Sequence, residues 1–148
     1  MERFQMKMDS LSRNEEFARV VVAVFMSRMN PTLEEIDDVK TAVSEAVTNA
    51  VIHGYQGKEG IIELEAWMEA CTESENEGKV SSLTVIIRDN GVGIRDVKRA
   101  MEPMYTTDRS GLRSGMGFSF MEAFMDEVQV DSTPQKGTTV TMVKRVRG

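Results

Sequence analysis

Three polar side chains recur at four-residue spacing in the stretch SEAVTNAVIHGYQG, namely Glu45, Asn49 and His53. In a helix, residues four apart lie about one turn above each other, so these side chains would share one flank. A carboxylate, an amide and an imidazole on such a flank can form the wall of a cleft that does chemistry. For this helix alone, a solvated face is the simpler interpretation, and His53 alone is typical of a helix end.

A second cluster, RDNGVGI (88–94), directly follows an apolar strand. Asp89 would leave the strand end with its carboxylate pointing outward, where it suits the exocyclic amine of adenine, a hydrogen-bond donor. Gly91 and Gly93 remove side chains where a flat ligand would otherwise meet the backbone. A simple turn at Asn90 is the alternative, but a helical stretch follows instead of a partner strand, and a turn needs no second glycine.

The loop RSGLRSGMGF (109–118) is rich in glycine. Its glycines free the backbone just before a predicted helix, where exposed N–H groups bind phosphate well. Two arginines, Arg109 and Arg113, can add charge-assisted contacts. On its own, such a loop is equally typical of a flexible linker. The glycines are Gly111, Gly115 and Gly117.

The segment KGTTV places Thr138 at a strand start, where its hydroxyl could brace Asp89. Each signal is weak alone, but their order is specific. The order E-x₃-N-x₃-H on a helix, D-x-G-x-G, S-G-x-G before a helix and G-T-T resembles the GHKL ATP-binding superfamily. The segments NEEFARV, VSEAVTNAVIHGY and YTTDRSGLRSGMGF further resemble the small bacterial switch kinases that act as sporulation anti-sigma factors. Two features set the chain apart: residues 71–82 form a longer segment than expected of the family, and Asn90 matches only the general superfamily pattern.

The resemblance implies an ATP or ADP site with Mg²⁺. Asn49 would bind Mg²⁺ through its carbonyl oxygen, with phosphate oxygens and water completing the coordination. Glu45 would be the general base for the attacking hydroxyl, and Asp89 would read adenine, with Gly91 and Gly93 allowing its approach. A lid over about 103–115 would close on the phosphates. The remaining nucleotide-binding residues implied by the resemblance are Thr106, Thr107, Arg113, Ser114, Gly115, Gly117 and Thr138.

The same resemblance implies an ATP-dependent protein-serine kinase that is also an anti-sigma factor. As a homodimer, it would sequester an RNA polymerase sigma factor and phosphorylate a serine of an anti-anti-sigma protein, with ATP or ADP deciding between partners. Arg19 matches the family's partner-contact arginine, although a solvated helix charge is the alternative. Two other functions stay open: a general-stress switch kinase, and a nucleotide-gated sigma-binding module without phosphotransfer. A histidine kinase catalytic domain fits poorly, because His53 lies inside the ATP-site helix.

Composition sets the broad class. A chain of 148 residues predicts one domain over 1–148, and 41% hydrophobic with 28% charged residues is typical of a globular protein. A net charge of −6 disfavours direct contact with nucleic-acid phosphates. No apolar run approaches the ~20 residues of a membrane span, and the N-terminus lacks a signal-peptide core. The single Cys71 cannot form an internal disulfide, so these features favour a cytoplasmic location.

Hydrophobic periodicity predicts the elements that position these residues. Alternation predicts a strand around residues 4–8, and capping boxes at Ser12 and Thr32 predict helices running to about Met29 and to His53, with Gly54 as the last cap. Strands are expected at 61–68, 83–89, 126–132 and 138–146, and helical stretches at 95–101 and 116–124. This order predicts an α+β fold. With the resemblance, it implies the two-layer α/β sandwich of the GHKL (Bergerat-type) ATPases, a mixed sheet with helices on one face.

Overall fold

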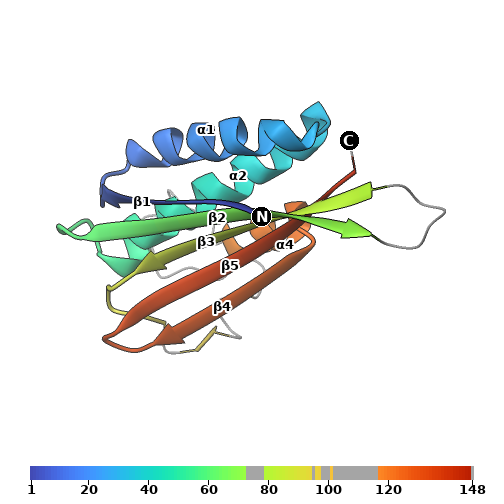
Figure 1. Cartoon of the computed structure of the whole chain (residues 1–148). Helices are drawn as coiled ribbons and strands as arrows, with labels where there is room; N and C mark the ends of the chain where they lie inside the picture. The colour runs from blue at the N-terminus through green and yellow to red at the C-terminus, as the bar shows by residue number, and fades with distance from the viewer. Residues whose placement is uncertain (73–78, 95, 98–100, 102–116, 148) are drawn as a thin grey trace.

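The computed structural model describes residues 1–72, 79–94, 96–97, 101 and 117–147. Among these residues, the helices cover one face of a sheet (Figure 1). In chain order the elements are β1 Glu2–Asp9, α1 Asn14–Met26, the 3₁₀ turn η1 Ser27–Met29, α2 Leu33–Asn49, the π-helical turn η2 Ala50–Gly54, β2 Ile61–Thr72, β3 Lys79–Asp89, α4 Gly117–Phe124, β4 Glu127–Thr133 and β5 Gly137–Val146.

The described strands form a five-stranded sheet in the order β1-β2-β3-β5-β4. The predicted α+β sandwich with helices on one face is confirmed. The expected mixed sheet is wrong, because every neighbouring pair of strands is antiparallel. The chain leaves β1, runs out along one helix and back along the next, and therefore enters β2 in the opposite direction to β1. β2 and β3 follow one another in the chain and pair antiparallel, as do β4 and β5.

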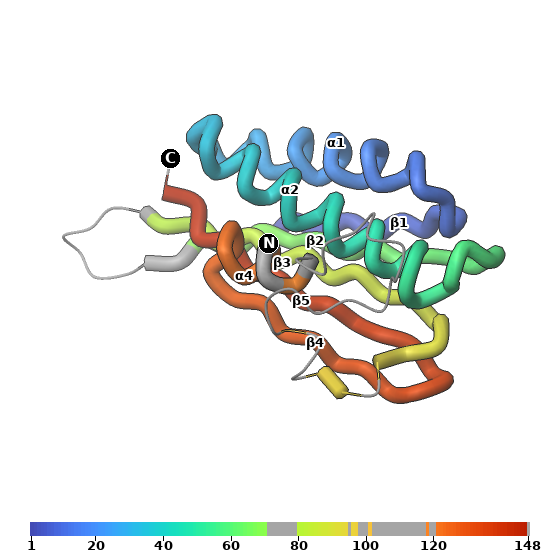
Figure 2. The backbone as a smooth tube through the Cα atoms, turned by 180° about the vertical axis from the view of Figure 1, so that it is seen from behind, coloured from blue at the N-terminus to red at the C-terminus, as the bar shows by residue number. Residues whose placement is uncertain are grey.

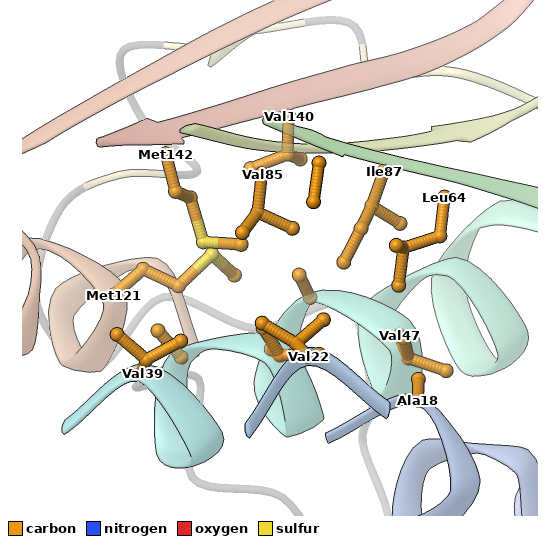
Figure 3. Close-up of a cluster of buried hydrophobic side chains, with 14 of the residues drawn as sticks. Ala18, Val22, Val39, Val47, Leu64, Val85, Ile87, Met121, Val140 and Met142 are labelled. Atoms are coloured by element: carbon orange, nitrogen blue, oxygen red, sulfur yellow. The ribbon is translucent and has the colours of Figure 1, made fainter. Parts of the chain in front are cut away.

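The core lies between the helices and the sheet. Side chains from α1, α2 and α4 meet those from β2, β3 and β5, and Met121 of α4 approaches Met142 of β5 (Figure 3). The apolar residues of α2 form a stripe at helical spacing that is buried here, apart from Ile36, which packs at the margin of the core. Because one flank of α2 is fixed in the core, the polar flank that carries Glu45 and Asn49 takes a defined direction.

The two predicted capping boxes have different outcomes. At α2 the box is present: Thr32 Oγ1 accepts from Glu35 N at 3.1 Å, and Glu35 Oε1 accepts from Thr32 N at 2.9 Å. At α1 it is wrong, because the cap position falls on Arg13 without a side-chain hydrogen bond. Ser12 contributes its backbone carbonyl instead, and the Asn14 amide donates to the Asp9 carbonyl at 2.7 Å.

The end of the second helix is wider than an α-helix. The predicted helical extent to His53 is confirmed, but its last five residues form the π turn η2, and the cap position falls on Tyr55 instead of Gly54. Tyr55 N donates to the Ala50 carbonyl at 2.9 Å, which closes this wider turn. β2 and β3 extend beyond the predicted strands to Thr72 and Lys79, into the segment 71–82, and residues 73–78 of that segment lie outside the described residues. Most of the helical stretch at 95–101 also lies outside them.

Candidate functional site

Asp89, the last residue of β3, is a buried carboxylate with an exposed fraction of 8%. Its Oδ1 accepts from Gly91 N at 2.9 Å, and the backbone N–H of Thr138 is its second donor. Burial raises the pKa of Asp89 above its usual range, and these two N–H groups oppose that rise. A carboxylate accepts about four hydrogen bonds, so this buried anion keeps capacity for a ligand that donates one.

Thr138 lies opposite Asp89 in the β3–β5 ladder, so the structure brings these two predicted site residues together. The expected brace through the Thr138 hydroxyl is wrong, because the backbone N–H makes the contact. The hydroxyl instead lies 2.8 Å from Ser132 Oγ. Ser132 was not expected at the site, and its Oγ also accepts from Ile94 N at 2.7 Å, which joins β4 to the segment after Asp89.

Gly91 and Gly93 fit closely against other parts of the backbone. A Cβ on Gly91 would lie 2.0 Å from the Gly54 carbonyl oxygen, and one on Gly93 would lie 2.2 Å from the Thr133 carbonyl oxygen. Gly93 also has a φ of +74°, which side chains other than glycine rarely adopt. Backbone packing therefore explains both glycines, and their clearance for a ligand stays a prediction.

Gly54 connects the end of the second helix to residues 89–92, the Asp89 turn. A Cβ on Gly54 would lie 2.8 Å from Asp89 Cγ, and the Gly54 carbonyl accepts from Val92 N at 2.9 Å. This contact places the helix that bears Asn49 against Asp89. The sequence offered only the glycine itself as a signal, and a glycine there is equally typical of a helix end.

Glu45 and Asn49 are half-buried on α2. Asp38 lies seven residues before Glu45, two turns along the same flank. The Asp38 carboxylate binds Lys144 Nζ at 3.0 Å, and Lys144 Nζ also donates to the Phe124 carbonyl at the end of α4 at 2.6 Å. The flank with Glu45 and Asn49 is therefore the one that faces α4, while α1 packs on the opposite side of α2 (Figure 2).

Several predicted site residues cannot be compared with the structure. Gly117 is the first residue of α4 instead of lying before the helix, and its role in nucleotide binding stays a prediction. The other residues of the predicted phosphate-binding set lie outside the described residues, and their roles stay predictions. They are Thr106, Thr107, Arg113, Ser114 and Gly115.

Arg19 lies on α1, away from the Asp89 turn. Its guanidinium is 3.8 Å from the Glu15 carboxylate, one turn earlier. Arg19 Nε and Glu15 Oε2 are buried atoms without a hydrogen-bond partner in the described part of the chain. Three apolar side chains on another side of α1 are exposed, with exposed fractions of 55% for Phe17, 47% for Val20 and 65% for Val24.

Comparison with known proteins defines the class first. The family model "Histidine kinase-like ATPase domain" matches residues 9–144, which places this fold among the nucleotide-binding ATPase domains of the GHKL type. In solved structures, the RsbU and RsbW domains of Rv1364c from Mycobacterium tuberculosis share the fold, with a TM-score of 0.61 and 18% identity over 99% of this chain and 33% of that chain.

Curated relatives narrow the class. The chain is 51% identical over 146 residues to the anti-sigma F factor of Clostridium novyi (strain NT), covering 97% of this chain and 95% of the relative. It is 53% identical over 137 residues to the anti-sigma F factor of Clostridium botulinum (strain Alaska E43 / Type E3), covering 92% and 89%. The chain therefore belongs to the anti-sigma F factor family of histidine kinase-like ATPase domains. Among the described residues, no helix is long and apolar enough to cross a membrane.

Proposed function

We propose that this protein is a cytoplasmic anti-sigma factor and an ATP-dependent protein-serine kinase. The observation that carries this proposal is the buried Asp89 carboxylate held against the end of the helix that bears Glu45 and Asn49. Relatives that share about half of its residues are named anti-sigma F factor, which supports a sigma factor as the partner.

The Asp89 turn fits an adenine nucleotide. The Asp89 carboxylate is buried, and two backbone N–H groups hold it in place. An exocyclic amine that donates to this carboxylate would stabilise its charged form, which burial disfavours. ATP or ADP would therefore bind with the adenine at Asp89 and its phosphates toward α2 and α4.

The flank of α2 supplies the chemistry. Asn49 would hold Mg²⁺ through its amide oxygen, and that ion would supply charge neutralisation at the phosphates. Glu45 lies one turn away and would take the proton of the acceptor serine hydroxyl. As the serine oxygen bonds to the γ-phosphorus, the bond to the leaving ADP breaks, and the products are a phosphoserine and ADP. A pure binding module would not need a carboxylate at this position.

The surface of α1 would receive the protein partners. Phe17, Val20 and Val24 recur at helical spacing and are exposed, so α1 presents an apolar patch, and it also carries the cation Arg19 about 100° or more around the helix from that patch. Such a combination suits a protein interface better than solvent. A sigma factor, an anti-anti-sigma protein with its acceptor serine, and a second copy of the chain in a homodimer are the proposed partners, and the nucleotide state would select among them.

A phosphotransfer assay tests the proposal. The protein is mixed with Mg²⁺, γ-labelled ATP and the anti-anti-sigma protein of the same genome, beside Glu45→Ala and the exposed control Glu127→Ala. Label on a serine of the partner is expected with wild type and Glu127→Ala, and its loss with Glu45→Ala. ATP affinity should be nearly unchanged in all three. Normal transfer by Glu45→Ala would remove Glu45 as the base.

A binding assay separates the remaining functions. Capture of the sporulation sigma factor, and its loss in Arg19→Glu with unchanged ATP affinity, is the expected result. Binding of ATP and of the sigma factor without any transferred label would instead establish a nucleotide-gated binding module. Capture of a general-stress sigma factor in place of the sporulation factor would identify a general-stress switch kinase.

A further inference from the structure

The hydroxyl of Tyr55 joins the end of the second helix to the start of β2, six residues further on, and to the residue after Asp89, 35 residues away. It accepts from the backbone N–H of Asn90 at 2.8 Å and donates to the carbonyl of Ile61 at 2.5 Å. The hydroxyl therefore donates its one proton in one bond and accepts through a lone pair in the other, so both bonds can form together. The tyrosine that follows the π turn is therefore bonded both to the residue after Asp89 and to the start of β2.

The ring of Tyr55 is held in one position by close packing. A Cβ on Gly60 would lie 2.4 Å from ring atom Cε1, so the ring lies directly against the backbone there. The ring also packs at the margin of the hydrophobic core. Its position depends on the π turn, because Tyr55 N donates to Ala50, five residues earlier. Isolated π turns of this kind are frequent at functional sites.

The bond to Tyr55 completes a set of fixed N–H groups around Asp89. The N–H of Asn90 binds Tyr55, the N–H of Gly91 binds Asp89 Oδ1, and the N–H of Val92 binds the Gly54 carbonyl. Three consecutive amides of the turn are therefore anchored, two of them to the end of the second helix. The direction of the Asp89 carboxylate depends on this anchoring, since the Asn90 amide follows Asp89 directly.

We propose that Tyr55 is a positioning residue for adenine recognition. Its hydroxyl sets the Asp89 turn so that the carboxylate meets the 6-amino group of the base. Discrimination between ATP and a purine nucleotide without that amine then depends on Tyr55, although Tyr55 does not touch the nucleotide. The inference rests on the proposed nucleotide site and goes beyond it by naming a residue that controls specificity.

Tyr55→Phe tests the role of the hydroxyl while keeping the ring. The dissociation constants of ATP and of purine riboside triphosphate, which lacks the 6-amino group, are measured by calorimetry with fixed Mg²⁺. The dissociation constant of purine riboside triphosphate divided by that of ATP should fall by about three- to tenfold in Tyr55→Phe, because one hydrogen bond to the turn is lost. The change should come from a higher dissociation constant for ATP, with that of purine riboside triphosphate nearly unchanged. Ser27→Ala is the matched control, since it removes a hydroxyl bond to a helical carbonyl (2.6 Å to Val24) far from the turn, and its ratio should equal that of wild type.

A stability role alone would not change this ratio. Equal weakening of both nucleotides in Tyr55→Phe, or an unchanged ratio, would overturn the role of Tyr55 and leave the nucleotide site standing. Failure of the wild type to bind ATP would overturn both proposals. If Tyr55→Phe does not fold, Gly60→Ala provides the second test. Its Cβ would push the ring away and pull the hydroxyl from Asn90, so the same fall in the ratio is expected, and an unchanged ratio would again refute the role.

Discussion

Replacement of Gly54 by alanine should lower the affinity for ATP strongly and the stability of the chain only slightly. The new Cβ would lie 2.8 Å from Asp89 Cγ and Oδ1, and 3.0 Å from Oδ2. These contacts are roughly 0.6 Å shorter than ordinary van der Waals contact, so the carboxylate must move. A shift of that size takes the bond between Asp89 Oδ1 and Gly91 N, now 2.9 Å, out of hydrogen-bonding range.

The two effects on stability oppose each other. Loss of a hydrogen bond to a charged group costs about 1.5–3 kcal/mol. Alanine is favoured over glycine in a helical turn by about 1 kcal/mol. The free energy of unfolding of Gly54→Ala should therefore fall by only about 0.5–2 kcal/mol. The adenine contact belongs to the same class of charge-assisted bond, so ATP affinity should fall by roughly 10- to 100-fold.

Gly57→Ala is the matched control for this prediction. Gly57 has a φ of +76°, and no atom lies within 4 Å of the position of its Cβ. Alanine there introduces backbone strain of about 1–2 kcal/mol without contacting Asp89. Urea denaturation gives the stability of both variants, and calorimetry gives their affinity for ATP. We expect comparable losses of stability, with normal ATP affinity in Gly57→Ala only. Normal ATP affinity in a folded Gly54→Ala would refute Asp89 as the adenine contact.

Three further outcomes are expected. Thr32→Ala should lower the free energy of unfolding by about 1 kcal/mol in urea denaturation, whereas Ser12→Ala should leave it nearly unchanged, because only Thr32 forms a capping box. Lys144→Met should cost about 1–3 kcal/mol by leaving the half-buried Asp38 carboxylate without its ion pair, and Asp38→Asn should restore part of that loss. Burial raises the pKa of Asp89, so folding favours its neutral form; the stability this adds is fully present below the unfolded-state pKa of about 3.8 and is lost as pH rises through the raised value. Denaturation of wild type and Asp89→Asn across that window should show the loss in wild type only, and parallel profiles would contradict it.

Local signals in the sequence were sufficient to predict much of the helix layer. The stripe of α2 and its polar flank follow from the 3.6-residue period, and the capping box at Thr32 follows from the spacing of two residues. The same spacing at Ser12 did not produce a box, because Asn14 N donates to the Leu11 carbonyl in a turn before α1, and the cap falls one residue after Ser12, on Arg13. A capping pattern fixes a helix start only when the preceding chain also allows it.

The contacts around Asp89 could not be predicted from local patterns. Tyr55 and Asn90 are 35 residues apart, and Ser132 and Ile94 are 38 apart, so each pairing depends on how the sheet and helices pack. The π turn adds one residue per turn and leaves no distinct period in so short a segment. The predicted order already placed two helices between β1 and β2, which returns the chain antiparallel to β1, so the mixed sheet came from the superfamily resemblance and not from the predicted elements.

The surroundings of Asp89 disfavour the charged form of its carboxylate. Burial raises the pKa of this carboxylate, so folding at neutral pH must desolvate an anion. Yet the backbone closes tightly around Asp89, because Gly54 and Gly137 each leave no room for a side chain there and Gly137 adopts a φ of +118°. A residue needed only for folding would gain from being replaced by a neutral group at this position. The same desolvation strengthens a hydrogen bond from a ligand donor, because the competing water is excluded. With adenine bound at Asp89 as proposed, the glycines, the π turn and Tyr55 would together keep this carboxylate in place for the ligand, at a cost in stability.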